Sequence, residues 1–344
     1  MRVAHIALGL ALWCAATVAA ALEVEEQRSY PGDGSVMLRV LSTADLDVFE
    51  PFLLRFQEKH PEIGVDYTVS SSAEVYRAIQ GGAAFDVVIS SAMDLQFQLA
   101  NDGFAESYAS DATEALPSWA KWRNLIFAFT SEPAVAVIST ERFEGLPIPR
   151  TRQELISVLR ANPARFEGAT GTYDVRSSGL GYLFATQEAR ISDAYWRLSE
   201  VMGRLGPQLY CCSAQMIDDV SEGRLAIAYN VLGSYAAQRV EGSEGSGMQI
   251  LAFEDFDNVM LRTALIPATV TAKDEAGTFV DALLEEGMRE QKGDWVLPPL
   301  AASREEQLSF GPIRLGPTLL VYLDPLNRRA FLESWRNALE QGLE

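Results

Sequence analysis

The stretch from Tyr210 to Ala236, YCCSAQMIDDVSEGRLAIAYNVLGSYA, predicts a helix, a strand and a second helix in direct succession. Ser213 is a favoured N-cap for the first helix, which continues with apolar residues at helical spacing. Gly223 suits the position after that helix, where the chain turns in a left-handed conformation. The apolar run Leu225 to Tyr229 then predicts a short strand. This succession is typical of an α/β protein.

Polar residues follow the predicted strand directly. Asn230, Gly233 and Ser234 lead from the strand into the next helix. In an open α/β sheet, ligands bind beyond the carboxyl ends of the strands, where the N–H groups of helix N-termini converge. We therefore expect Ser213 and Asn230 to belong to a small-molecule site.

The first part of the chain repeats a strand-to-helix unit. The predicted pairs are Val36–Leu41 with a helix at Asp45–His60, Val65–Val69 with a helix through Val75 and Ile79, and Asp86–Ile89 with a helix at about Met93–Asn101. Strands that alternate with helices predict a parallel sheet with right-handed crossovers. The fold class is therefore α/β.

Hydroxyl side chains follow each of these three strands. They are Thr43 after the first strand, Ser71 and Ser72 after the second, and Ser91 after the third. Any single serine here is explained as an ordinary N-cap. Three such turns at one sheet edge also suit the oxygens of a carboxylate or phosphate, so we expect a binding surface there.

An arginine lies in the glycine- and serine-rich turn from Gly171 to Gly181, before a helix that is predicted from about Tyr182. Arg176 suits bidentate capture of an oxyanion, although a surface arginine beside a helix cap explains it equally well. A dinucleotide-binding glycine pattern is not supported, because Phe184 stands where a third glycine is needed.

Residues 1–21, MRVAHIALGLALWCAATVAAA, have the pattern of a cleaved secretory signal peptide, with basic Arg2, an apolar run and small residues at the end. No later apolar run reaches the roughly 18 to 20 residues that span a bilayer. The 28 basic and 47 acidic residues give −19, and loss of Arg2 gives 27 − 47 = −20. Such a charge disfavours binding to nucleic acids and anionic lipids, and it predicts that a bound anion needs a local positive site.

After cleavage, two adjacent cysteines and one histidine are left. Cys211 and Cys212 allow a vicinal disulfide, a reduced dithiol that takes a soft ion, or a small apolar pair. His60 lies at the end of a predicted helix, just before Pro61, where it suits solvent better than a catalytic triad. The sequence lacks a phosphate-binding loop, a nucleophile elbow and zinc-binding motifs, so an enzyme would have to work without them.

The remaining segments predict how two lobes are joined. The polar run 23–35 suggests a mobile tail, and 105–132 suggests packing residues and a loop. Pro133 precedes a short strand, Ala134–Ile138, that is expected to cross between lobes, and Val259–Ile266 is expected to return. The length favours two lobes. We assign residues 36–133 to the first part of lobe 1, 134–248 to lobe 2, and 249–344 to the return to lobe 1 and the C-terminal helices.

Three segments carry a family resemblance: DVVISSAMDLQFQLANDGF at 86–104, TYDVRSSGLGYLFATQ at 172–187 and EGRLAIAYNVLGSYA at 222–236. With them the chain resembles the bacterial periplasmic solute-binding proteins of type 2, in the branch of ferric-iron-binding and phosphoglycerate-transport-associated proteins. The resemblance implies two α/β lobes, mixed sheets with helices on both faces, and a hinge that closes on a ligand. It also implies a monomeric periplasmic protein that is not an enzyme and has no cofactor.

The resemblance further implies a set of ligand-binding positions. They are Thr43, Ser71, Ser72 and Ser91 in the first lobe, and Tyr173, Arg176, Ser177, Ser213 and Asn230 in the second. These residues favour a small organic anion, either phosphorylated or a carboxylate, and the expected partner is an ABC permease or a membrane histidine kinase.

Ferric iron is a weaker alternative ligand. The iron-binding members place adjacent tyrosines just beyond the strand at 225–229, whereas here Tyr235 stands alone after Asn230–Ser234. A metal or metalloid site at Cys211 and Cys212 also stays open, as does a periplasmic enzyme, which would turn its ligand over.

Overall fold

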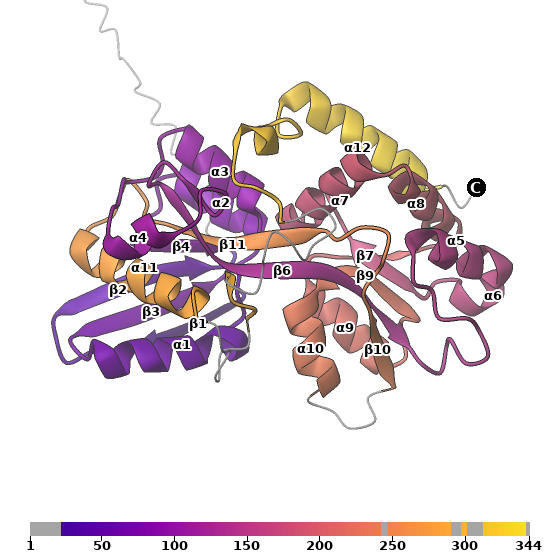
Figure 1. The fold of residues 1–344 in the computed structure, drawn as a ribbon, viewed down its shortest axis with the longest axis horizontal. Helices are drawn as coiled ribbons and strands as arrows, with labels where there is room; N and C mark the ends of the chain where they lie inside the picture. Colours follow the sequence, from indigo (N-terminus) through magenta and orange to yellow (C-terminus); the bar gives the residue numbers. More distant parts are fainter. Residues whose placement is uncertain (1–21, 242–246, 290–296, 301–311, 342–344) are drawn as a thin grey trace, which may run out of the picture.

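The computed structural model describes residues 22–241, 247–289, 297–300 and 312–341. The predicted signal peptide, residues 1–21, and most of the predicted loop at 241–247 lie outside the described residues. The rest forms a mixed α/β fold whose central sheet extends through two lobes (Figure 1). Within the described part of the chain, no helix combines the length and the apolar character needed to cross a bilayer.

The strand-to-helix units predicted for the first lobe are present. Their elements are β2 (Val36–Ser42), α1 (Leu46–Lys59), β3 (Ile63–Val69), α2 (Ser72–Gln80), β4 (Val87–Ser90) and α3 (Met93–Asn101). Strand β2 pairs in parallel with β3 on one side and with β4 on the other. Parallel pairing brings the carboxyl ends of the three strands, and the helix starts that follow them, to one edge of the sheet.

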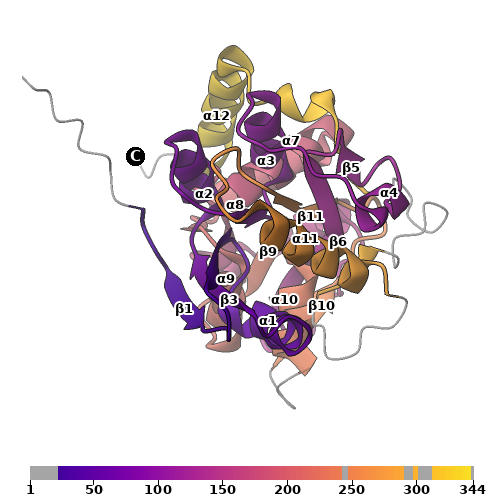
Figure 2. The same ribbon diagram turned by 90° about the vertical axis from the view of Figure 1, so that its left-hand side faces the viewer.

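The prediction of a mobile tail before β2 is wrong. Residues Glu26–Tyr30 form β1, which pairs antiparallel with β3 at the edge of the first lobe (Figure 2). A hydrophobicity pattern does not reveal this strand, because most of its side chains are polar and backbone hydrogen bonds hold the pairing. The side chains of Gln27 and Ser29 add hydrogen bonds to Asp66 on β3.

Two long strands connect the lobes. Strand β6 (Ile126–Ser139) pairs antiparallel with β11 (Val259–Leu265), and the two run side by side from one lobe into the other (Figure 1). The prediction of a crossing strand at 134–138 is confirmed, but the loop predicted up to residue 132 is wrong for its last seven positions, where β6 has already begun. Pro133 misled the prediction, since proline is tolerated where a strand exchanges one pairing partner for another. Here β11 pairs with β6 up to Pro133, and β9 (Ile227–Leu232) pairs with it from Ala134.

The second lobe continues the sheet on the far side of β6. In chain order its elements are α5 (Arg152–Ala161), α6 (Pro163–Phe166), β7 (Thr170–Tyr173), α7 (Gly179–Ile191), α8 (Ala194–Arg204), β8 (Gln208–Tyr210), α9 (Ser213–Ser221), β9, α10 (Gly233–Glu241) and β10 (Met248–Leu251). Strand β7 pairs in parallel with both β8 and β9, whereas β10 pairs antiparallel with β6. The helix, strand and helix predicted for residues 210–236 therefore match α9, β9 and α10, although the strand begins two residues later than expected.

The C-terminal part of the chain contacts both lobes. Helix α11 (Lys273–Gly287) packs on β6 in the first lobe, and α12 (Pro325–Leu339) packs on α8 in the second. The buried side chains of Phe331 and Trp335 join α12 to the apolar core of the second lobe. Helix α12 therefore fixes the end of the described chain on the outer side of that lobe (Figure 1).

A buried ion pair joins the two crossing strands. Arg262 on β11 and Glu132 on β6 are both fully buried, with Arg262 Nε 2.9 Å from Glu132 Oε1. Glu132 also accepts hydrogen bonds from Thr130 on β6 and from Ser234 at the start of α10. The pair is thus held by residues of both lobes at the point where the chain passes between them.

Candidate functional site

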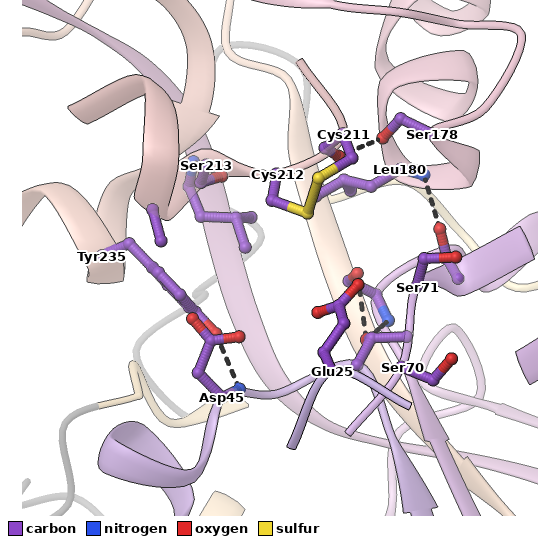
Figure 3. A pocket seen from close by; sticks show the side chains of 15 residues that line it. Glu25, Asp45, Ser70, Ser71, Ser178, Leu180, Cys211, Cys212, Ser213 and Tyr235 are labelled. Atoms are coloured by element: carbon purple, nitrogen blue, oxygen red, sulfur yellow. Dashed lines mark hydrogen bonds between the residues drawn. A yellow bond between two sulfur atoms is a disulfide. The ribbon is translucent and has the colours of Figure 1, made fainter. Parts of the chain in front are cut away.

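The strand ends of the two lobes face each other across a cavity of about 60 Å³ (Figure 3). Its wall comes from the residue before β1 and the turns after β2, β3 and β4 in one lobe, and from the turns after β7, β8 and β9 in the other. The lining residues are Glu25, Thr43, Asp45, Ser70, Ser71, Ser72, Ser91, Ser178, Leu180, Cys211, Cys212, Ser213, Ala214, Leu232 and Tyr235. The wall is therefore rich in hydroxyl groups.

The first-lobe residues that the sequence singled out meet in this cavity. Thr43, Ser71, Ser72 and Ser91 all line it. The Thr43 hydroxyl accepts the Ser91 N–H at 3.0 Å, which joins the turn after β2 to the turn after β4. The Ser71 hydroxyl caps α2 by accepting the Glu74 N–H. Parallel pairing brings these separate hydroxyls together.

Two serines hold the second-lobe wall. Ser178 caps α7 by accepting the Gly181 N–H, and it donates a hydrogen bond to the Cys211 carbonyl at 2.8 Å. Ser213 is not the N-cap that the sequence suggested, because Cys212 occupies that position and Ser213 is the first residue of α9. The Ser213 hydroxyl instead accepts the Leu232 N–H at 3.0 Å, which fixes the start of α9 against β9.

Direct hydrogen bonds link the lobes beside the cavity. The Ser72 hydroxyl, at the start of α2, accepts N–H bonds from Gly179 and Leu180 at the start of α7. The Asp45 N–H, just before α1, donates to the Tyr235 hydroxyl of α10 at 3.1 Å. These contacts bring the lobes together and explain why the cavity between them is small.

The charged groups of the cavity are acidic. Glu25 and Asp45 line it, whereas neither Lys nor Arg is among the described residues of its wall. Burial first, and then the charge of Asp45, raise the pKa of the Glu25 carboxyl. Burial and the neighbouring Asp47 likewise raise the pKa of Asp45. Sequence reasoning missed both residues, because Glu25 fell in the predicted tail and Asp45 counted only as a helix start.

Arg176 and Ser177 line a neighbouring cavity of about 440 Å³, which shares only Ser178 with the first. The guanidinium of Arg176 is exposed and forms ion pairs with Asp174 at 2.8 Å and with Glu340 at 2.6 Å. It therefore ties the turn after β7 to the region beyond α12, at the rim of the second lobe.

Tyr173 and Asn230 line a third, smaller cavity inside the second lobe. The backbone of Asn230 is left-handed, with a φ of 66°, at a bulge where Tyr229 and Asn230 lie opposite a single residue of β6. Asparagine tolerates this conformation better than most residues. The residue type alone does not reveal that the backbone at this position is left-handed.

Cys211 and Cys212 form a disulfide, which distinguishes among the three states that the sequence allowed. Both residues line the cavity between the lobes, so the bridge forms part of its wall (Figure 3). In this state neither sulfur is a thiolate, the form that binds soft metal ions. Within the described ranges, no group of three or more His, Cys, Asp or Glu side chains is arranged to hold a metal ion.

Known structures share this architecture. The substrate-binding protein of an ABC transporter from Agrobacterium tumefaciens superposes with a TM-score of 0.84 and 29% identity, over 91% of this chain and 98% of its own. AfuA from Actinobacillus pleuropneumoniae, with exogenous fructose-6-phosphate bound, gives 0.70 and 17%, over 90% and 100%. Iron-bound HitA from Pseudomonas aeruginosa gives 0.64 and 16%, over 88% and 99%. These likenesses agree with the two-lobed fold of the periplasmic binding proteins.

The sequence comparisons point the same way. No curated protein matches the chain, but the family model for bacterial extracellular solute-binding proteins matches residues 42–290. That match covers well over half of the sequence, and it includes every turn from β2 to β9 that lines the cavity. The chain therefore belongs to the family of bacterial extracellular solute-binding proteins, which serve ABC transporters.

Proposed function

We propose that the protein captures a small organic solute with an oxyanion group, a phosphate or a carboxylate, in the cavity between its lobes. The observation that carries this proposal is the start of α9. Its N-cap, Cys212, makes no side-chain capping bond, and Ser213 and Ala214 at its first positions line the cavity. The first N–H groups of a helix lack intrahelical partners and attract anions.

The hydroxyl groups of the cavity support the same assignment. Ser71 and Ser91 from the first lobe can donate hydrogen bonds to oxygens of a bound anion. Closure of the lobes then completes the site, and the ligand leaves chemically unchanged. AfuA, whose structure contains fructose-6-phosphate, is an example of a similar fold with such a solute.

The proposed partner is the permease of an ABC transporter, and the proposed location is the periplasm. The relative from Agrobacterium tumefaciens is the substrate-binding protein of such a transporter, and the family is extracellular. This favours transport over signalling through a histidine kinase. The family also consists of proteins that bind solutes for transport, which favours binding over catalysis.

A thermal-shift and calorimetry screen of residues 22–344 tests the proposal. The panel contains phosphoglycerates, phosphoenolpyruvate, fructose 6-phosphate, dicarboxylates and tricarboxylates, ferric citrate and arsenite. A ligand at a hundred times its dissociation constant adds about 2.7 kcal/mol of stability. Binding of at least one organic anion is expected, and a response to ferric citrate or arsenite alone would contradict the proposal.

A single backbone N–H can then be removed at the site. Ala214→Pro deletes an N–H in the first turn of α9, where proline is tolerated, and should weaken anion binding about tenfold or more. Gln153→Pro makes the same change at the equivalent position of α5, away from the cavity, and should leave affinity unchanged. If the two variants bind the anion with equal affinity, the start of α9 has no role in binding.

A further inference from the structure

Two carboxylates project into the same cavity from the first lobe (Figure 3). Glu25 lies just before β1, where its N–H donates to the Val69 carbonyl at the end of β3. Asp45 lies just before α1, with its N–H held by Tyr235. Neither carboxylate accepts a hydrogen bond from another described residue, and Asp45 does not cap α1 with its side chain. Both groups are therefore fixed through their backbones and leave their oxygens available.

Glu25 and Asp45 lie across the cavity from the start of α9. Figure 3 shows Glu25 and Asp45 on one side of the cavity, with Ser213 and the disulfide of Cys211 and Cys212 on the other. An ionised carboxylate only accepts hydrogen bonds, and it repels a second negative group. A ligand that displaces water from this side must therefore bring its own hydrogen-bond donors.

We infer that the solute has two unlike ends: an oxyanion that binds at the start of α9, and hydroxyl or ammonium donors that bind Glu25 and Asp45. This inference rests on the proposed function and narrows it. It disfavours compact di- and tricarboxylates, which would place negative charge beside both acids. It favours hydroxylated or amino-substituted monoanions and phosphate esters.

The apolar part of the wall agrees with such a ligand. The disulfide, Leu180 and Leu232 give the largely polar lining an apolar part. A carbon skeleton between the two polar ends can pack against these groups while its hydroxyl or amino substituents face the acids. A short chain or ring with several polar substituents meets both demands.

Calorimetry with four probes tests the inference. Fructose 6-phosphate offers hydroxyl donors, phosphoethanolamine offers an ammonium group, propyl phosphate offers neither on its carbon chain, and citrate carries several carboxylates. We expect fructose 6-phosphate or phosphoethanolamine to bind at least tenfold more tightly than propyl phosphate and citrate. The tighter of the two identifies the donor as hydroxyl or ammonium.

Replacing each cavity acid by its neutral amide then tests which residues bind the hydrogen-bond donors of the ligand. Glu25→Gln and Asp45→Asn should each weaken the preferred probe about tenfold, while propyl phosphate binds as before or better. Glu26→Gln and Asp47→Asn remove the same charge at adjacent exposed positions outside the cavity wall, and should change neither affinity by more than about twofold. Circular dichroism of all four variants checks that each is folded.

Failure of this inference and failure of the proposed function give different results. If propyl phosphate or citrate binds as tightly as the donor-bearing probes, and both cavity variants match the wild type, the inference is overturned while the oxyanion proposal stands. If no phosphate or carboxylate probe binds folded wild-type protein, the proposed function itself fails.

Discussion

The hydroxyl of Ser72 accepts the backbone N–H of Gly179 at 3.0 Å, across the boundary between the two lobes. Each residue is the first of its helix, α2 in one lobe and α7 in the other. A methyl group on Gly179 would lie 2.7 Å from the Ser72 oxygen and 2.8 Å from Leu95 Cδ1. The glycine therefore allows the close approach on which the small cavity depends.

Gly179→Ala should hold the lobes apart. The added methyl group meets side chains of the first lobe, so we expect a larger radius of gyration by small-angle X-ray scattering and about tenfold weaker ligand binding. Gly316→Ala is the matched control, because no heavy atom lies within 4 Å of its added methyl group. Wild-type values for both quantities in Gly179→Ala would show that the contact does not govern closure.

Arg262→Met should destabilise the fold strongly. The change leaves Glu132 charged and fully buried without its cation, which typically costs about 3–5 kcal/mol. The free energy of unfolding in urea measures the loss. Arg150→Met breaks an exposed pair with Glu254 and should cost less than about 1 kcal/mol. Similar losses for the two variants would contradict a special role for the buried pair.

Asp94 should make stability depend on pH. Burial raises the pKa of its carboxyl to about 7, and one of its oxygens, Oδ1, lacks a hydrogen-bond partner within the described structure. Between about pH 4 and pH 7 the folded state binds more protons at this group than the unfolded state, so the contribution of Asp94 to stability falls as pH rises. The fall ends above the folded pKa.

Asp94→Asn removes this titration. Its free energy of unfolding, relative to that of the wild type, should be higher at pH 8 than at pH 5 by on the order of 2 kcal/mol. Asp102→Asn, at an exposed position at the end of the same helix, should show no such difference. Parallel pH profiles for Asp94→Asn and the wild type would rule out a protonated Asp94 at neutral pH.

Arg176→Ala should affect stability slightly and affinity less than threefold. Its guanidinium is engaged with Asp174 and Glu340, and Arg176 does not line the cavity between the lobes. Exposed ion pairs of this kind contribute about 0–1 kcal/mol each. Calorimetry with the best ligand checks the prediction, and a loss of binding would instead extend the site into the neighbouring cavity beside Arg77 and Arg328.

The sequence predicted the fold best where apolar spacing decides structure. Strands β2 to β4 and helices α1 to α3 were placed within a few residues, since their buried side chains repeat at strand or helix spacing. Strand β1 was missed because backbone bonds and polar side chains hold it. The first half of β6 was missed because its buried residues run without alternation up to Pro133.

The candidate site was predicted in part for a related reason. The hydroxyl turns at Thr43, Ser71 and Ser91 were foreseen because parallel strands end at one edge of a sheet. Glu25 reaches the cavity only because β1 pairs with β3, and no hydrophobic pattern in its sequence predicts that strand. Asn230 lies beside a different cavity, and its left-handed backbone accounts for the residue type.

The order of strands also constrains how the chain is made. Strands β4 and β6 do not pair with each other, since β11 lies between them. A ribosome must therefore finish residues 259–265 before the sheet of the first lobe can close, although most of that lobe was synthesised much earlier. Until then the edges of β4 and β6 that β11 covers have no partner strand, so the sheet of the first lobe is completed only after the second lobe has been made.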